Sequence, residues 1–249
     1  KANGDENAIH PNDIEQGQQI GDCYLMASLA AIAVQNPHLI EKMIKDNKDG
    51  TYTVTFYKKK FSGGYETVEI MVNQKDLTRK LGFQMERARL GDRVNGKEEA
   101  WARIIECAYA KWNGGYKNIE GGNPSPTMEE LTGARTDTPL FASFDKIANS
   151  FDDGDAIALS SLRDVEYLPD WTNVRKKYRN GELSANHSYY VTGIDRANKT
   201  VTLRNPWGWK HQEIVMGFSD LRKLFRKVRI NECGGIGNGS GGGGSGGMG

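Results

Sequence analysis

The sequence predicts an α+β protein that is rich in helices in its first half and rich in strands in its second half. Residues 23–34, CYLMASLAAIAV, are apolar, rich in Ala and free of Gly and Pro, which is typical of a buried helix. After residue 155, three runs rich in apolar and β-branched residues are bounded by turn residues, which is typical of strands. The 249 residues suit one large domain or two small lobes.

Three elements are expected in the first half. The helix that begins at Cys23 ends at Asn36-Pro37, because the residue before a proline avoids helical geometry. The runs at 51–60 and 65–72 alternate apolar and polar residues around Ser-Gly-Gly, which predicts a hairpin. A second helix is expected from Lys97 to Trp112, because apolar side chains recur there at helical spacing, namely Trp101, Ile104, Ile105, Ala108 and Trp112.

A break in the pattern divides the chain. Gly121-Gly122 and the following NPSP interrupt the helical half, so we place the lobe boundary after Gly122. Two short helices and three strands are expected beyond it: Met128–Leu131, Phe144–Asn149, 156–161, 187–196 and 199–207. The expected units are a helical lobe at 1–122, a strand-rich lobe at 123–233 and a flexible Gly/Ser tail at 234–249.

Composition excludes several classes of partner. The chain carries 33 Lys and Arg against 32 Asp and Glu, so its charge favours neither nucleic acid nor an anionic membrane. No apolar run approaches the roughly 18–20 residues that span a bilayer. The chain lacks an initiator Met, and we expect a soluble, monomeric fragment of a cytoplasmic or secreted protein.

One of the three cysteines is a candidate nucleophile. Cys23, Cys107 and Cys233 are too widely spaced for a disulfide framework or a close set of metal ligands. Cys23 follows Gly21-Asp22 and opens the apolar helix, where the positive end of the helix dipole favours a thiolate. Taken alone, such a cysteine is more often a small buried hydrophobic residue, so its function depends on partners.

Two further residues supply those partners. A cysteine hydrolase needs an imidazole base and a third group that orients the ring. His187 begins one predicted strand and Asn205 follows the next, so antiparallel pairing would bring them together. Alone they would be a strand cap and an Asx turn. With Cys23 they give the order Cys, His, Asn, which resembles the papain-like arrangement.

Whole segments around these residues resemble the calpain family. DIEQGQQIGDCYLMASLAAIA is similar to its active-cysteine segment, NHSYYVTG to its histidine segment and LRNPWGW to its Asn-Pro-Trp-Gly motif. EEAWARIIECAYAKWNGGYKNIEGGNPSPTMEELTG and GFSDLRKLFRKVRI extend the resemblance from about Asp13 to Ile230. It implies a two-lobed papain-like cysteine protease fold, with the cysteine on the helical lobe and the histidine and asparagine on a barrel-like lobe.

The resemblance also implies an activity and the residues that perform it. The chain would be an endopeptidase that hydrolyses peptide bonds in protein or peptide substrates through a thioester acyl-enzyme, with Cys23, His187 and Asn205 as the catalytic triad. The oxyanion donor would be Gln16, with Gln18 as the alternative, because one extra residue separates Gln16-Gly17 from Gly21-Asp22-Cys23.

Three more residues are implied for the cleft. Trp207 would cover the bond between the histidine and the asparagine, while Gly122 and the backbone of Asn186 would hold the substrate main chain. The family usually has glycine at the position of Asn186.

A calcium site is implied, although the chemistry itself needs no cofactor. Asp13 and Glu99 fall on the carboxylate positions, with backbone carbonyls near Glu6 and Ala8 as co-ligands. A second site is expected to be absent, because the acidic pair after Trp-Gly is replaced by Trp209, Lys210 and His211.

Two other functions use the same residues. A papain-fold acyl transferase or deamidase would use the same triad on another acceptor. A non-catalytic protein-binding module is the third reading, because a fold can persist without its site. The presence of all three catalytic residue types argues against that module.

Overall fold

The computed structural model describes residues 9–17, 20–78, 87–88, 93–94, 97–98, 100–163, 165, 173–208 and 210–236. Its helices are η2 (Pro11–Asp13), α1 (Cys23–Gln35), α2 (Pro37–Met43), α3 (Gln74–Thr78), α4 (Trp101–Trp112), η3 (Tyr116–Ile119), α5 (Pro124–Thr132), α6 (Phe144–Asp152), α7 (Asn173–Arg179) and α8 (Phe218–Leu224). Its strands are β1 (Ile44–Asp46), β2 (Thr51–Lys59), β3 (Tyr65–Asn73), β4 (Arg93–Val94), β5 (Lys97–Glu98), β6 (Thr136–Asp137), β7 (Ala156–Ser161), β8 (Ser188–Asp195), β9 (Thr200–Arg204), β10 (Ile214–Gly217) and β11 (Phe225–Asn231).

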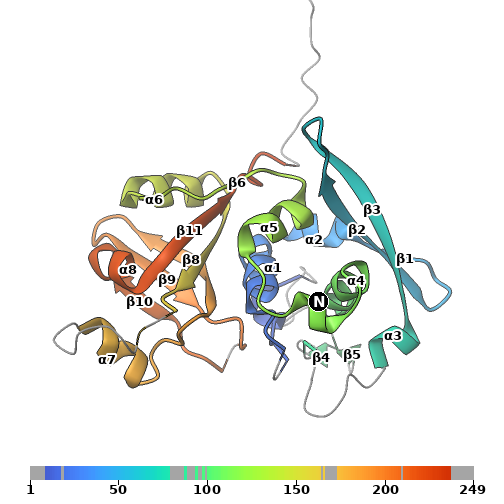
Figure 1. Ribbon diagram of the computed structural model, residues 1–249, viewed down its shortest axis with the longest axis horizontal. Coiled ribbons are helices and arrows are strands. Elements are labelled where there is room, and N and C mark those ends of the chain that lie inside the picture. The colour runs from blue at the N-terminus through green and yellow to red at the C-terminus, as the bar shows by residue number, and fades with distance from the viewer. Residues whose placement is uncertain are drawn as a thin grey trace, which may run out of the picture.

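The strands form antiparallel sheets, so the predicted α+β class is confirmed. One sheet has the order β1-β2-β3, the largest has the order β10-β9-β8-β7-β11-β6, and β4 pairs with β5. In Figure 1 the helix α1 lies between the six-stranded sheet and the part of the chain that holds β2, β3 and α4. The α1 helix contacts both β7 and β8, so the helix that begins at Cys23 packs directly on the sheet.

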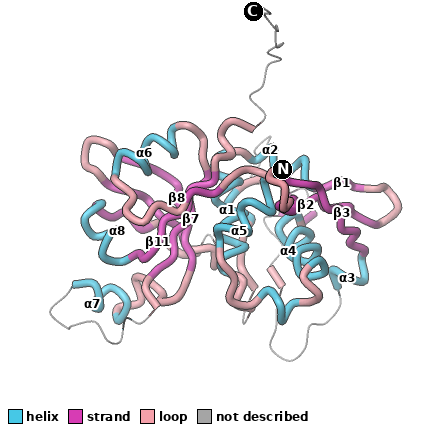
Figure 2. Tube along the Cα trace, turned by 45° about the horizontal axis from the view of Figure 1, so that its top comes forward, coloured by secondary structure: helices cyan, strands magenta, loops and turns pink. Residues whose placement is uncertain are grey.

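The central strands separate two hydrophobic cores. Successive side chains of a strand point to opposite faces. On one face Ala158 and Tyr190 join a core built on α1, while on the other Leu159 and Tyr189 join a core with α6 and α8. Figures 1 and 2 show α6 and α8 on the side of the sheet away from α1. Met128 and Leu131 of α5 belong to the α1 core.

The buried helix predicted at 23–34 is confirmed. All residues of α1 from Tyr24 to Ala33 are buried, which explains its nearly uniform apolar composition. The chain turns at Asn36, whose amide donates to the carbonyl of Ile32, and α2 begins at once with Pro37 at its first position. The second helix was not predicted, because Asn-Pro indicates only the end of the first.

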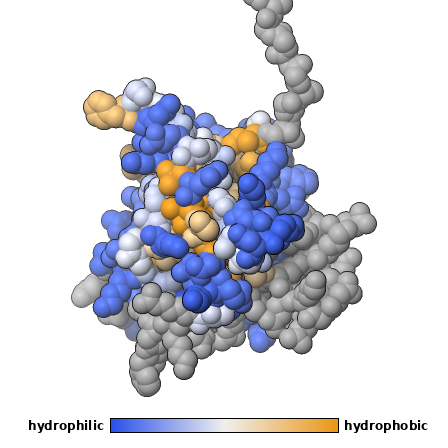
Figure 3. Space-filling view, turned by 90° about the vertical axis from the view of Figure 1, so that its right-hand side faces the viewer, coloured by the Kyte–Doolittle hydropathy of each residue, from blue (hydrophilic) through white to orange (hydrophobic). Residues whose placement is uncertain are grey.

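The predicted hairpin is also confirmed. The strands β2 and β3 pair from Thr51 opposite Asn73 to Lys59 opposite Tyr65. Figure 3 shows the molecule from this side, where apolar groups gather among hydrophilic ones. Phe61 in the turn and Met71 on β3 are large apolar side chains that remain exposed.

Two predicted helix boundaries were wrong. The helix expected from Lys97 begins at Trp101, because Lys97 and Glu98 pair with β4 and the apolar periodicity begins only at the tryptophan. The helix expected from Met128 begins at Pro124. Asn123 caps it by accepting the amide of Ser125 at 3.2 Å, and proline is well tolerated in a first helical turn.

The first residues of the expected tail contact the rest of the chain. The amide of Gly234 donates to Asp155 Oδ1 at 3.3 Å, and Asn36 Nδ2 donates to the carbonyl of Ile236 at 2.9 Å. The remainder of the expected tail, residues 237–249, lies outside the described residues.

No single helix in the described residues is long and apolar enough to cross a membrane. The helices α1 and α2 pass that test only when they are joined, and they are bent by 118°.

Candidate active site

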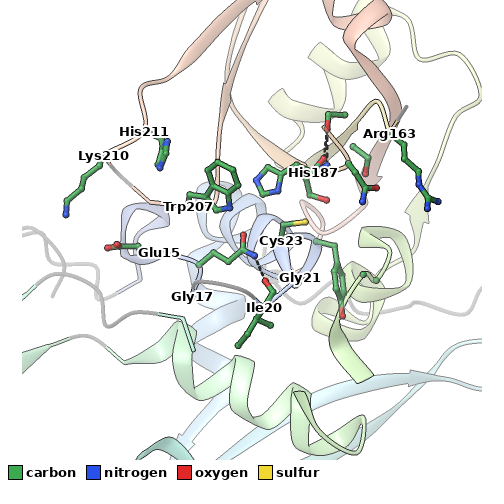
Figure 4. Close-up of a pocket in the computed structure, with 18 residues that line it drawn as sticks. Glu15, Gly17, Ile20, Gly21, Cys23, Arg163, His187, Trp207, Lys210 and His211 are labelled. Carbon is green, nitrogen blue, oxygen red and sulfur yellow. Dashed lines mark hydrogen bonds between the residues drawn. The ribbon is translucent and has the colours of Figure 1, made fainter. Parts of the chain in front are cut away.

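A cleft of about 1080 Å³ brings the predicted triad residues to one place. Its lining comes from the start of α1, the loop before it, the turn at 121–122, the end of β7 and the loops that flank β8 and β9. Cys23, His187 and Trp207 line the same opening (Figure 4). Asn205 lies behind the histidine and is buried.

Cys23 is the first residue of α1 and is half-buried, whereas Cys107 and Cys233 are buried. The helix begins on Asp22, whose carbonyl accepts the amides of Leu25 and Met26 at 2.9 and 3.1 Å. The sulfur therefore lies at the N-terminal end of a helix of 13 residues, where the macrodipole favours negative charge.

The pairing of β8 with β9 joins His187 to Asn205. The strands are antiparallel, as predicted, with Tyr190 opposite Arg204. Beyond that pair, His187 Nε2 lies 2.9 Å from Asn205 Oδ1. The same oxygen accepts the amide of Trp207 at 3.0 Å, so it acts as an acceptor and Nε2 must carry the hydrogen. The unprotonated nitrogen of the neutral imidazole is then Nδ1.

Ser161 fixes the backbone of the histidine. Its Oγ accepts the amide of His187 at 3.0 Å, and its own amide donates to the carbonyl of His187 at 2.9 Å. The hydroxyl also donates to the carbonyl of Ser184 at 2.7 Å. Sequence reasoning missed this residue. The only available signal was its place at the end of an apolar strand, AIALSS.

Burial disfavours the charged forms of Cys23 and His187. It lowers the pKa of His187 to about 4, although the Asn205 hydrogen bond acts in the opposite direction. Burial also raises the pKa of the Cys23 thiol, while the backbone and hydroxyl of Ser188 lower it. A neutral thiol beside a neutral imidazole follows, and Ser188 is a second residue that sequence reasoning missed.

Gln16 lies in the cleft beside the cysteine, as expected. Its amide donates to the carbonyl of Pro206 at 2.9 Å, which fixes the loop against the segment that follows Asn205. Its side-chain Nε2 donates to the carbonyl of Ile20 at 2.8 Å, drawn as a dashed line in Figure 4. An amide nitrogen has two hydrogens, so one remains for another acceptor. The alternative donor, Gln18, lies outside the described residues.

Gly122 and Asn186 both line the cleft, and the local geometry explains each residue type. A Cβ atom on Gly122 would lie 2.2 Å from the ring of Tyr24, so only glycine fits there without a shift of the ring. Asn186 has a φ of 50°, in the left-handed region that favours glycine and that asparagine tolerates. Asparagine can therefore occupy the position where the family usually has glycine.

Trp207 packs against the histidine. The centroids of the two rings are 4.6 Å apart, and the indole is 40% exposed. On its other side the indole contacts the ring of His211 at 5.5 Å. The indole thus contacts two histidine rings that line the cleft.

Two buried carboxyl groups, Asp22 and Glu106, interact near the start of α1. Asp22 and Glu106 are both fully buried, and both oxygens of Glu106 accept the amide of Ala88 at 3.0 and 2.9 Å. Burial raises the pKa of Asp22 to about 7 and that of Glu106 well above its usual value. The negative charge of Asp22 raises the pKa of Glu106 further.

Only one of the expected calcium ligands belongs to the described residues. Asp13 is buried, and its Oδ2 accepts the amide of His10 at 2.8 Å and Trp101 Nε1 at 3.0 Å. Its Oδ1 is enclosed and has no hydrogen-bonding partner there, which suits a cation ligand. Glu99, Glu6 and Ala8 lie outside the described residues. No group of three or more His, Cys, Asp or Glu in the described part could hold a metal ion.

Comparisons with known proteins agree with this site. A family model described as calpain family cysteine protease matches residues 5–237. A calpain of Schistosoma mansoni is 29% identical over 210 residues, which cover 80% of this chain and 26% of the relative. Calpain-9 of Mus musculus is 27% identical over 236 residues, covering 88% and 31%. The calpain-1 catalytic subunit of Bos taurus is 28% identical over 210 residues, covering 79% and 27%. The chain thus spans 26–31% of the length of these relatives.

Proposed function

The chain belongs to the calpain family of cysteine proteases, and we propose on this basis that it is a calpain-like endopeptidase that acts on protein substrates. One observation carries the proposed mechanism. His187 Nε2 lies 2.9 Å from Asn205 Oδ1 in the wall of the cleft that Cys23 lines. This geometry supports Cys23 as the nucleophile, His187 as the base and Asn205 as the orienting group.

The proposed reaction proceeds through a thioester. As Cys23 Sγ attacks the peptide carbonyl carbon, the thiol proton passes to His187 Nδ1. Collapse of the tetrahedral intermediate breaks the C–N bond, and the imidazolium gives its proton to the leaving amine. Water then attacks the thioester while His187 accepts its proton, and the proton returns to the thiolate as the acid is released.

The proposed oxyanion site consists of the backbone N–H of Cys23 and the second hydrogen of Gln16 Nε2. Gln16 and Cys23 both line the cleft, which supports this assignment. Donors that are already held in place stabilise the developing charge without reorganisation. Gln18 remains the alternative donor.

The finer architecture is also a proposal. A two-lobed papain-like fold, with lobes at 1–122 and 123–233, is supported by the two hydrophobic cores and by cleft residues drawn from both parts of the chain. Superposition of an experimental structure on a papain-like protease is the direct test of this architecture.

Calcium binding is proposed at Asp13, with Glu99 and the carbonyls near Glu6 and Ala8 as the expected co-ligands. The enclosed Oδ1 of Asp13 supports it, because an unpartnered buried carboxylate oxygen is unfavourable without a cation. Bound calcium would supply positive charge between the segment before α1 and α4, which Asp13 already joins through Trp101.

The experiment that tests the protease compares casein digestion by the wild-type chain and the Cys23→Ala variant, with calcium present. We expect fragments with new N-termini from the wild type and none from the variant. A thiol-directed epoxide should label Cys23 and leave Cys107 and Cys233 unlabelled, because both are buried. Cleavage that persists in Cys23→Ala contradicts the mechanism.

The same samples separate the alternative functions. If Cys23 reacts with the epoxide while casein stays intact, mass spectrometry of the casein side chains distinguishes a deamidase or acyl transferase from a protease. If Cys23 is no more reactive than Cys107, a binding module becomes the better reading.

A further inference from the structure

Ser188 directly follows the histidine of the cleft, and its side chain faces the helix that carries the cysteine. It begins β8 and pairs with Ser160 on β7. Alternate residues of a strand share a face of the sheet. Tyr190, two residues further along β8, belongs to the core built on α1, whereas Tyr189 belongs to the core on the other face. The hydroxyl of Ser188 is therefore directed toward α1.

The residue of α1 that meets this hydroxyl is Cys23. It is the first residue of the helix, α1 packs on β8, and Cys23 and Ser188 line the same cleft. In Figure 4 Cys23 lies beside His187, the residue that precedes Ser188. Ser188 is only 3% exposed, so its hydroxyl is largely removed from water. No oxygen or nitrogen of another described residue bonds this hydroxyl, and its hydrogen-bonding partner is the Cys23 sulfur.

A hydroxyl at this sulfur favours the thiolate over the thiol. A thiolate can only accept hydrogen bonds, and a hydrogen bond to the charged form of an acid lowers its pKa. Burial raises the pKa of the Cys23 thiol and the negative charge of Asp22 raises it as well, whereas the backbone and the hydroxyl of Ser188 lower it. Ser188 thus opposes the two influences that disfavour the nucleophilic form of the cysteine.

His187 and Ser188 act on one sulfur in complementary ways. In the proposed mechanism the imidazole accepts the thiol proton, while the hydroxyl keeps its own proton and donates a hydrogen bond. Hydrogen bonds to a charged acceptor are stronger than those between neutral groups, so this bond strengthens as the thiol proton leaves. The segment that carries both groups is held in place, because Ser161 Oγ accepts the amide of His187 at 3.0 Å.

We propose that Ser188 is a further catalytic residue, whose hydroxyl donates a hydrogen bond to Cys23 Sγ whenever the sulfur carries negative charge. The proposal rests on the proposed function, in which Cys23 is the nucleophile. The sulfur becomes negative twice in each cycle: as its proton passes to His187, and as the C–S bond of the thioester breaks and the thiolate leaves. Ser188 gives up no proton in either step, so every other proton transfer of the reaction stays the same.

The rate at which iodoacetamide alkylates Cys23 tests this role without a peptide substrate. The thiolate is the reactive form, so at a pH below the thiol pKa the rate follows the thiolate fraction. Peptide mass spectrometry assigns the product to Cys23 rather than to the buried Cys107 or Cys233. We expect Ser188→Ala to react about 10-fold more slowly than the wild type at each pH from about 6 to 8, as for a thiol pKa raised by about one unit.

Further variants isolate the hydroxyl from the shape of the side chain. Ser188→Thr keeps the hydroxyl and Ser188→Val replaces it with a methyl group, and both new side chains are favoured in strands. We expect Ser188→Thr to react at close to the wild-type rate and Ser188→Val to react about 10-fold more slowly. The control is Ser150→Ala, which removes a hydroxyl from a similarly buried serine on α6 and should keep the wild-type rate.

Equal alkylation rates for the wild type and Ser188→Ala overturn the role of Ser188 and leave the protease proposal intact. If Ser188→Ala does not fold, equal rates for Ser188→Thr and Ser188→Val have the same meaning. A loss of equal size in Ser150→Ala assigns the effect to the stability of the fold and also overturns the role. Wild-type Cys23 that reacts no faster than Cys107 overturns the nucleophile assignment, and the role of Ser188 with it.

Discussion

His187 Nε2 lies 2.9 Å from Asn205 Oδ1, and that oxygen also accepts the amide of Trp207 at 3.0 Å. The second bond prevents the asparagine amide from turning over, since a flipped amide would place two donors face to face. The imidazole is therefore held in one tautomer, with Nδ1 free to accept a proton. The arrangement depends on the antiparallel pairing of β8 and β9.

Replacing Asn205 with alanine should impair turnover more than binding. The variant loses the bond that orients the ring and stabilises the imidazolium, and hydrogen bonds to charged groups contribute about 1.5–3 kcal/mol. We expect kcat to fall by roughly 10- to 100-fold with a small change in KM. Asn198→Ala, in the exposed turn between β8 and β9, is the matched control. Equal activity of the two variants contradicts an orienting role for Asn205.

Replacing Trp207 with alanine should move the acid limb of the pH profile. Burial holds the pKa of His187 at about 4, so the imidazole stays neutral, and able to act as a base, down to that pH. Removing the indole admits water, which raises the pKa toward the ordinary 6.5. The variant should therefore lose kcat/KM at pH 5 relative to pH 7.5, while Phe61→Ala, an exposed apolar control, keeps the wild-type profile. If the acid limb of Trp207→Ala matches that of the wild type, the indole is not the source of the burial that lowers the pKa of His187.

The stability of the Glu106→Gln variant relative to the wild type should increase as pH rises. The folded-state pKa of Asp22, about 7, and that of Glu106 are raised, so folding takes up protons that the unfolded chain releases near pH 4. The contribution of this pair to the free energy of unfolding of the wild type is fully present below the unfolded-state pKa values. It is lost as pH rises through the folded-state pKa values. The glutamine removes one of the two titrations and keeps the size and polarity of the side chain.

Urea unfolding at pH 5, 6, 7 and 8 measures this effect. The free energy of unfolding of Glu106→Gln relative to wild type should increase by up to about 1.4 kcal/mol per pH unit. Glu69→Gln, an exposed glutamate on β3, should show a constant difference. Parallel pH curves for wild type and Glu106→Gln would contradict a raised pKa of Glu106 in the folded chain.

Calcium should stabilise the wild-type chain through Asp13. A ligand that binds only the folded state at 100 times its Kd adds about 2.7 kcal/mol, which thermal unfolding detects as a higher midpoint. Asp13→Asn should lose most of this shift, because the enclosed Oδ1 is replaced by a weaker ligand or a donor. Asp145→Asn, an exposed aspartate on α6, is the control. A wild-type midpoint that does not respond to calcium rules out the site.

Elements with a strong local pattern could be predicted, and elements that depend on their neighbours could not. The helix α1 has a nearly uniform apolar composition over 13 residues, and the strands β2 and β3 alternate apolar and polar residues over nine residues each. The helices α2 and α8 have seven residues each, too short to form without tertiary contacts. The strand β11 alternates poorly, because it carries Arg and Lys, and only pairing with β7 and β6 places it inside the sheet.

The sequence by itself determined the family and the order of Cys23, His187 and Asn205, because motif spacing and local periodicity are properties of short segments. The tertiary structure alone decided which distant groups share an environment. It placed Glu106 near Asp22, Ser161 on the backbone of His187 and the buried Arg229 against Asn123 and Ser160. Burial and charge compensation depend on packing between elements far apart in the chain, so no local pattern encodes them.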